Sequence, residues 1–158
     1  MHILYYSWNE HTYNDMLDTL TSLGHQVSTI RYTLSNYFND SSFEEQFSEI
    51  LDQTSFSFLY SFNFFPILSK IAQNHHIPYV CWVYDCPHPT LYAKELTNEC
   101  NYIFHFDKMM VEYYEKLGAK HIYHLPLAVH TGRLANQLQI HPSMDLAEFS
   151  NLTYEHEV

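Results

Sequence analysis

Short apolar runs alternate with longer amphipathic segments over most of this chain. The runs predict strands at residues 3–6, 27–32, 56–60, 79–84, 102–106 and 121–125. The amphipathic segments between them predict helices, which begin near residues 15, 43, 66, 91 and 107. Because strands alternate with helices and short loops, we expect the α/β fold class. The arrangement is a Rossmann-like three-layer α/β/α domain with a mainly parallel sheet of about six strands.

Polar residues and glycines mark the ends of the predicted helices. Asn14 can cap the first helix, and Ser42 with Glu45 resembles a capping box before the second. Gly24 and Gly118 stand where the chain leaves a helix and needs a positive φ angle. These positions predict where the connecting loops begin.

The alternating pattern ends near residue 131. Residues 134–140 predict a helical turn or two, and residues 142–158 are polar and acidic, with too few apolar side chains for a second core. The length of 158 residues fits a single domain. We therefore expect a domain at residues 1–134 and a polar linker at residues 135–158.

The charge balance excludes several classes of partner. Seven Lys and Arg against 18 Asp and Glu give a formal net charge of −11, and the basic residues form no cluster. We therefore expect no binding to nucleic acid and no electrostatic docking on an anionic membrane. No apolar run approaches the ~18 residues of a membrane span, which predicts no integral membrane segment.

The cysteines predict a reducing compartment. Cys81, Cys86 and Cys100 are odd in number and lack the paired spacing of a metal site. Cys81 falls within an apolar run, as a buried core residue would. Reduced thiols are typical of the cytoplasm, which is the location we predict.

Three loops are candidates for a binding site. In open parallel sheets, ligands bind beyond the carboxyl ends of the strands, near the switch in strand order. The loops after the first, third and fourth predicted strands span residues 7–13, 61–65 and 85–90. The sequence therefore places candidate chemistry in these loops.

The first loop is rich in side chains and lacks glycine. Trp8 offers a stacking face, and three polar neighbours can contact a substrate: Asn9, Glu10 and His11. A dinucleotide or P-loop site needs glycines that let backbone N–H groups approach phosphate, and the glycines lie elsewhere. We therefore expect no NAD, FAD or other cofactor. The alternative is a solvated loop with no functional role.

An acid and a histidine follow the fourth predicted strand. Asp85 comes after the apolar residues 79–84, so the strand carries it to the rim of the sheet, and His88 nearby can transfer a proton. The alternative is that Asp85 only caps a turn. Asn63 stands among phenylalanines, and it provides either a polar contact within an aromatic wall or a turn.

The 12 histidines do not predict a metal site. His75 and His76 are adjacent, so their side chains diverge at a helix end. His121 and His124 lie on a predicted strand at positions that point to opposite faces. No pair has the H-x-x-x-H spacing that places two ligands on one helix face.

Several stretches together resemble a known domain. They are HILYYSWNEHTYND at residues 2–15, SFNFFP at residues 61–66 and YVCWVYDCPHPTL at residues 79–91. They resemble the N-terminal domain of bacterial GT-B glycosyltransferases of the spore-maturation-protein-like group, which are similar to glycosyltransferase families 1 and 4. The segment IYHLPLAVH at residues 122–130 is similar to the one that closes the first Rossmann half in many GT-B enzymes, with His130 replacing the usual Asp or Asn.

This resemblance, which covers about residues 1–134, implies the acceptor-side half of a sugar transferase. The C-terminal nucleotide-sugar-binding domain would follow the linker, and the half present here would be inactive alone. A nucleotide-sugar donor and an unknown acceptor are the implied substrates, and GT-B catalysis generally needs no protein-bound metal. Asp85 and His88 would lie nearest the reacting groups, with Trp8, Asn9 and Asn63 in contact with substrate.

Two further expectations accompany this interpretation. The interdomain face of such a half would be uncovered, which favours a homodimer in solution. The alternative function is a non-catalytic Rossmann-like module that binds a ligand or a protein, because the sequence contains no complete catalytic set.

Overall fold

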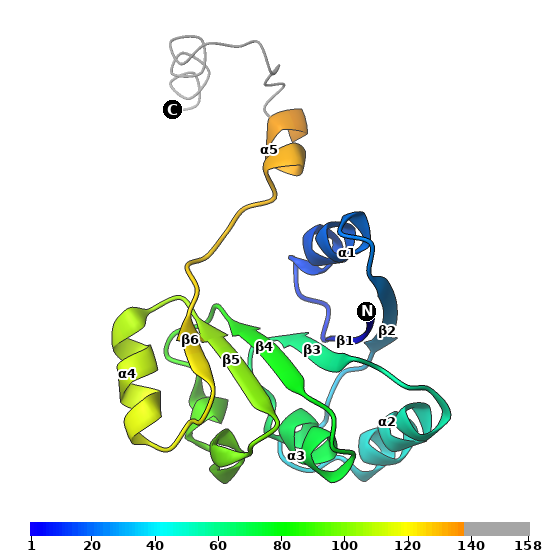
Figure 1. Cartoon of the computed structure of the whole chain (residues 1–158), viewed down its shortest axis with the longest axis vertical. Helices are drawn as coiled ribbons and strands as arrows, with labels where there is room; N and C mark the ends of the chain where they lie inside the picture. The colour runs from blue at the N-terminus through cyan, green and yellow to red at the C-terminus, as the bar shows by residue number, and fades with distance from the viewer. Residues whose placement is uncertain (138–158) are drawn as a thin grey trace. The chain divides into compact units, whose positions relative to one another are not determined.

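The computed structural model describes residues 1–137, and the chain divides into two compact units, Met1–Leu127 and Ala128–Val158 (Figure 1). In the second unit, α5 (Thr131–Gln137) overlaps the helical turn predicted at residues 134–140. Residues 138–158, and with them most of the predicted linker, lie outside the described residues.

A six-stranded sheet forms the centre of the first unit, and every pair of neighbouring strands is parallel. The strands are β1 (His2–Ser7), β2 (Gln26–Arg31), β3 (Phe58–Phe62), β4 (Tyr79–Val83), β5 (Asn101–His105) and β6 (Ile122–His124). Their order is β2-β1-β3-β4-β5-β6, which confirms the predicted Rossmann-like α/β fold. The order reverses at β1, so the switch point lies between β1 and β3.

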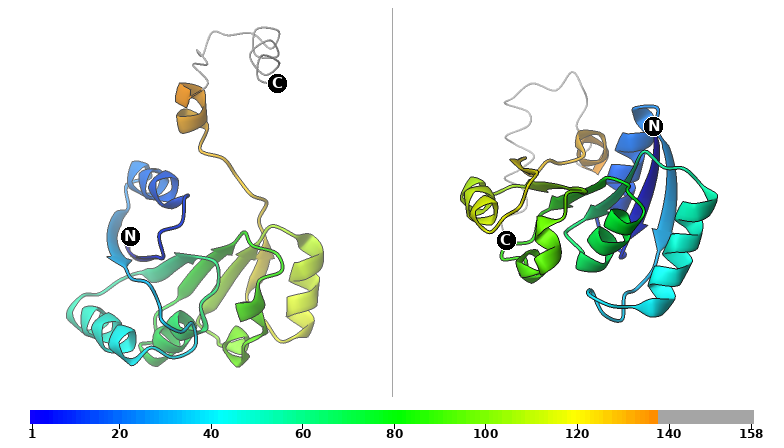
Figure 2. Two further views of the ribbon diagram at one scale, coloured as in Figure 1. Left: turned by 180° about the vertical axis from the view of Figure 1, so that it is seen from behind. Right: turned by 60° about the horizontal axis from the view of Figure 1, so that its bottom comes forward.

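Helices connect the strands on both sides of the sheet. They are α1 (Tyr13–Ser22), α2 (Ser41–Gln53), α3 (Pro66–Asn74) and α4 (Lys108–Lys116), with two short 3₁₀ helices, η1 (Pro89–Tyr92) and η2 (Lys94–Thr97). The single short helix predicted near residues 91–96 is thus two separate 3₁₀ turns. Figure 2 shows the same elements from two other directions.

The two faces of the sheet are covered unequally. The four connections from β2 to β6 all run in the same direction across the sheet, so right-handed crossovers place α2, α3 and α4 on one face. The connection from β1 to β2 runs the opposite way and places α1 on the other face. The larger core accordingly includes Phe43 and Phe47 of α2 with Ile67 and Leu68 of α3. The smaller core contains Tyr5 and Phe62 of the sheet, against which α1 packs.

Two predicted helix caps are wrong. The first turn of α1 begins after Thr12, which makes no side-chain cap bond, and Asn14 lies inside the helix. At α2 the N-cap is Asp40, whose carboxylate accepts the Phe43 N–H at 3.1 Å. Asp40 precedes Ser42 by two residues and takes the cap because its carboxylate also accepts the N–H and hydroxyl of Ser35.

The third strand lies two residues later than predicted. Residues 58–62 form β3, because Leu59 to Phe62 pair with Tyr79 to Trp82 of β4. The polar Ser61 is accommodated inside the sheet, since its hydroxyl lies 2.7 Å from the Tyr79 hydroxyl and donates to the Asn63 carbonyl. The loop after this strand therefore starts at Asn63.

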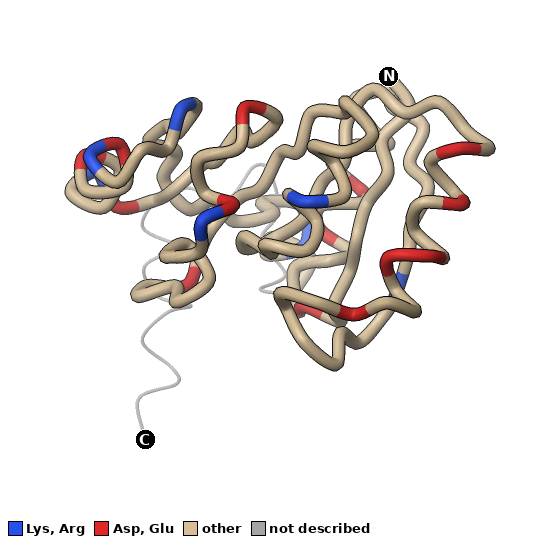
Figure 3. Tube along the Cα trace, turned by 90° about the horizontal axis from the view of Figure 1, so that it is seen from below, with Lys and Arg blue, Asp and Glu red and all other residues tan. Residues whose placement is uncertain are grey.

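Acidic positions are spread over the helices and loops, and the few basic positions do not gather at one place (Figure 3). Among residues 1–137, no helix is long and apolar enough to cross a membrane.

Candidate functional site

The carboxyl ends of β1, β3 and β4 carry the loops that the sequence nominated. β1 lies between β2 and β3, and β4 pairs with the other side of β3, so the three loops leave neighbouring strands. The first two of them flank the switch point in the strand order. The candidate residues are therefore brought to one edge of the sheet.

Asn63 and Asp85 meet at this edge, although 22 positions separate them in sequence. The Asn63 amide Nδ2 donates to the Asp85 carboxylate Oδ2 at 2.7 Å. The Asn63 Oδ1 accepts the N–H groups of Tyr84 and Asp85 at 3.2 and 3.4 Å. Asn63 is buried and Asp85 is exposed, so the amide fixes a carboxylate that solvent can reach.

Glu10 is the buried acid of the first loop, at 4% exposure. Its carboxylate accepts the Tyr5 hydroxyl at 2.5 Å, the Ser7 hydroxyl at 3.1 Å and the Trp8 N–H at 3.0 Å. Burial and this carboxylate raise the pKa of Tyr5, which stays a donor. These bonds hold the loop in shape, and direct contact of Glu10 with a substrate stays a prediction.

The other residues of the first loop differ in how firmly they are held. The Trp8 ring is half-buried, and its Nε1 donates to the Phe62 carbonyl at 3.3 Å, which joins this loop to the end of β3. Asn9 and His11 are exposed. Trp8 and Asn9 thus lie at the same edge as Asn63, and their contact with a substrate stays a prediction.

Strained backbone marks both loops that flank the switch point. Asn9 has a φ of +72° and Asn63 a φ of +61°, in the left-handed region that disfavours residues with a Cβ atom. The third such non-glycine residue among those described, His76, lies at the end of α3. Left-handed residues cluster at functional sites when the surrounding structure holds them there.

His88 lies beneath this edge and not on it. It is 9% exposed, and its Nε2 lies 3.2 Å from the Phe64 nitrogen and 3.1 Å from the Phe64 oxygen. Burial lowers the pKa of His88, which favours the neutral ring. The ring therefore anchors the turn after β4 to the chain after β3, and a role in proton transfer stays a prediction.

A buried polar layer supports the edge from below, and the sequence did not reveal it. The Tyr79 hydroxyl accepts the Phe65 N–H at 3.0 Å, and the Thr90 hydroxyl donates to the Phe64 carbonyl at 2.5 Å. Tyr79 lies in a segment whose sequence predicts an apolar strand, and Thr90 lies in a predicted loop. Their partners are backbone groups 14 and 26 positions away, so no local motif signals them.

A second buried histidine, His105, ends β5 close to this layer. Its ring is completely buried, and its Nδ1 accepts the Asp107 N–H at 3.0 Å. Its Nε2 has no hydrogen-bond partner among the described residues. Burial lowers the pKa of His105, and the nearby His88 acts in the same direction. Both histidines are therefore expected to be neutral at pH 7.

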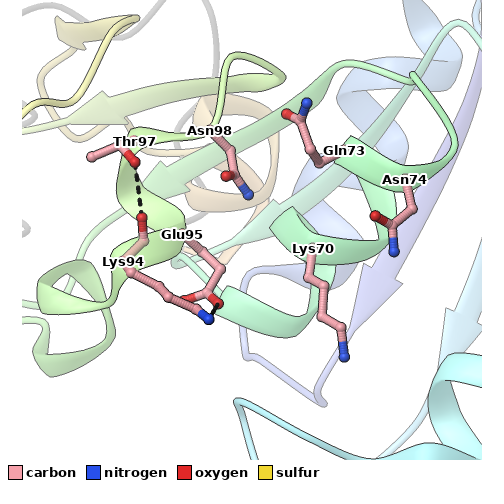
Figure 4. A pocket seen from close by; sticks show the side chains of 7 residues that line it. All are labelled: Lys70, Gln73, Asn74, Lys94, Glu95, Thr97 and Asn98. Carbon is pink, nitrogen blue, oxygen red and sulfur yellow. Dashed lines mark hydrogen bonds and ion pairs between the residues drawn. The ribbon is translucent and has the colours of Figure 1, made fainter.

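One surface groove lies away from this edge, between α3 and η2 (Figure 4). It has a volume of about 380 Å³ and is lined by Lys70, Gln73, Asn74, Lys94, Glu95, Thr97 and Asn98. Lys70 forms an ion pair with Glu44 at 2.8 Å and Lys94 lies 3.9 Å from Glu95. Because both ammonium groups face carboxylates, the groove offers little attraction to an anion.

Within residues 1–137, no group of three or more His, Cys, Asp or Glu side chains is arranged to hold a metal ion. Beside Asn63 and Asp85 the groups at the carboxyl edge are carboxylates, amides and aromatic rings, and the cation at the end of β2, Arg31, lies over the Tyr13 ring at 4.4 Å. Such an edge suits a ligand that offers hydroxyl groups and apolar ring faces.

Comparison with protein-family models finds no family whose model matches this chain, and a search of curated proteins finds no matching relative. The resemblance to glycosyltransferases therefore stays a prediction.

Proposed function

We propose that residues 1–134 are the acceptor-side half of a GT-B glycosyltransferase, which moves a sugar from a nucleotide-sugar donor to an acceptor hydroxyl. The observation that carries the proposal is the pairing of Asn63 with Asp85 at the carboxyl edge beside the switch point. An oriented carboxylate that solvent can reach is what activation of a hydroxyl group requires. The side-chain-rich loop from Trp8 to His11 supplies further contacts.

Asp85 acts as the general base in this proposal. The described bond to Asn63 uses Oδ2, so Oδ1 can accept a hydrogen bond from the acceptor hydroxyl. The hydroxyl oxygen forms a bond to the anomeric carbon of the donor while the nucleoside diphosphate leaves with the electron pair of the broken bond. The hydroxyl proton passes to Asp85 and then to solvent. His88 positions the turn that carries Asp85.

The donor nucleotide binds mainly outside this half. The first loop has no glycine, its one buried charge is the carboxylate of Glu10, and the neighbouring Arg31 lies over the Tyr13 ring, so the loop offers a pyrophosphate no open backbone. We therefore assign the nucleotide-sugar site to a C-terminal domain that follows the linker. Residues 1–158 alone should bind no nucleotide and catalyse no transfer.

Calorimetric titration tests this assignment. UDP, GDP and their common sugar conjugates are titrated against residues 1–158 and against a polypeptide that continues past Val158 into a second Rossmann domain. Binding by the longer chain alone supports the proposal. If neither polypeptide binds, the proposal of an active enzyme that uses these donors is rejected.

Turnover by the longer chain tests Asp85. Asp85→Ala should lower kcat by about 100-fold or more, since general base catalysis contributes roughly that much. Asp52→Ala is the matched control, because the Asp52 side chain is 71% exposed on α2, which packs on the face of the sheet that α1 does not cover. Equal kcat for Asp85→Ala and the unmodified chain would remove Asp85 from the mechanism.

A non-catalytic binding module is the second candidate. It is favoured by the hydrogen bonds of Glu10 and His88, which engage both groups in holding loops. The two functions differ in one measurement. A module would bind a saccharide or protein at the carboxyl edge, and no donor would be consumed by any longer form of the chain.

A further inference from the structure

Four aromatic rings form a row across the sheet, on the face that α1 covers only in part. The parallel register aligns one ring from each of strands β3 to β6: Phe62, Trp82, Phe104 and Tyr123. The Phe62 and Trp82 ring centroids are 5.8 Å apart, and those of Phe104 and Tyr123 are 5.5 Å apart. We call these four residues the aromatic row.

Exposure of the aromatic row rises with distance from α1. Phe62 is 4% exposed, Trp82 and Phe104 are half-buried, and Tyr123 is 44% exposed. Tyr102 lies on the same face, is 36% exposed and stacks on His121 at 4.8 Å. The sheet thus presents an aromatic, uncharged surface over β4, β5 and β6, whereas parallel sheets are normally covered on both faces.

The size of this surface decides what it can bind. Three gaps between strands span about 14 Å, and a repeat of two residues along a strand is about 7 Å, so the row covers on the order of 100 Å². A stable protein interface needs about 800 Å² from each partner. The net charge of −11 on each copy further opposes self-association. A small, uncharged ligand fits the surface better than a second copy of the chain.

One end of the aromatic row lies at the carboxyl edge of the sheet, where Asn63 pairs with Asp85. Phe62 immediately precedes Asn63, and the Tyr84 ring lies 5.3 Å from the Phe62 ring and immediately precedes Asp85. Burial and the neighbouring Asp85 raise the pKa of Tyr84 to about 12, so its hydroxyl remains a hydrogen-bond donor at neutral pH. The aromatic row therefore adjoins the hydrogen-bonding side chains of Asn63, Tyr84 and Asp85.

We propose that the aromatic row binds an uncharged oligosaccharide. Pyranose rings present apolar C–H faces that stack on aromatic rings, and their hydroxyl groups bind to tyrosine hydroxyls, amides and carboxylates. The surface is elongated, which suits several sugar units in line. This inference rests on the proposed function in one respect: the saccharide is then the acceptor, and its terminal hydroxyl lies at Asp85.

Titration of residues 1–158 with three neutral pentasaccharides tests the inference. Maltopentaose, cellopentaose and chitopentaose are added without nucleotide, and binding is followed by calorimetry and by the fluorescence of the tryptophans. Tyr123→Ala should weaken saturable binding of at least one of them by about tenfold, and Tyr123→Phe should retain it. Tyr113→Ala is the matched control, since Tyr113 is 43% exposed on α4, which packs on the opposite face.

The outcomes separate the possibilities. Failure of all three sugars to bind, or an equal loss in Tyr113→Ala, overturns the inference. Sedimentation that shows dimers of the chain, lost in Tyr123→Ala, overturns it in favour of a second copy. Binding of a pentasaccharide without any donor turnover by the longer polypeptide keeps this inference and rejects the proposed function. Donor turnover without pentasaccharide binding keeps the proposed function and rejects this inference.

Discussion

The side-chain amide of Asn63 donates to the carboxylate of Asp85 at 2.7 Å and accepts the Asp85 backbone N–H through its oxygen. One side chain thus fixes both the main chain and the carboxylate of its partner. Because Asn63 itself has a left-handed backbone, residues that tolerate such a φ angle suit this position best.

Replacing Asn63 separates its backbone role from its side-chain role. Asn63→Gly removes the amide but keeps the left-handed conformation, whereas Asn63→Ala also adds strain of about 1 kcal/mol. We expect Ala to lower the free energy of unfolding more than Gly by about that amount, as measured by urea denaturation. Equal stability of the two variants would show that the strain at this position is no larger than the conformational entropy that glycine adds to the unfolded chain.

Glu10 should matter for stability even where no substrate is present. Glu10→Ala leaves the Tyr5 hydroxyl and the Trp8 N–H without their acceptor, in a buried setting. We expect a loss of about 2–4 kcal/mol in the free energy of unfolding. Glu112→Ala, on the exposed surface of α4, is the control and should change stability by less than about 0.5 kcal/mol. A loss as small as the control's would show that the loop keeps its shape without this carboxylate.

Stability should fall when the pH is lowered from 7 through the ordinary histidine range. Burial lowers the pKa of both His88 and His105 in the folded state, so the unfolded chain takes up protons first. The unfolded state then binds more protons than the folded state below about pH 6.5, so the free energy of unfolding decreases as the pH falls. The loss ends once the pH is below the folded-state pKa values.

Urea denaturation at a series of pH values between 7 and 5 measures this dependence. His88→Gln and His105→Gln should each make the slope shallower, because each removes one of the two groups. A slope that stays the same in both variants would assign the pH dependence to other residues.

The periodicity of the chain was sufficient to predict the class of fold, because alternating strands and helices have few compact arrangements. The order of the strands, by contrast, could not be predicted from periodicity. The position of β1 between β2 and β3 depends on which strands pair, and pairing partners up to 55 residues apart, such as Ile3 and Phe58, leave no local signal.

The candidate site was predicted at the level of loops and only partly at the level of residues. The apolar run before Asp85 correctly indicated its exposed position at the end of a strand. The contact between Asn63 and Asp85 follows from the register of β3 and β4, which the sequence does not determine. The buried setting of Glu10 depends on Tyr5, whose ring the alternation of the strand does not distinguish from other core rings.

β1 lies inside the sheet, between β2 and β3, although it comes first among the strands in sequence. His2 to Ser7 pair with β2 and Ile3 to Tyr6 pair with β3, so β1 is an interior strand of the sheet. During synthesis this strand is made first, yet its second neighbour exists only once Phe62 has been added. Deletion of residues 2–7 would therefore remove an interior strand and separate β2 from the rest of the sheet.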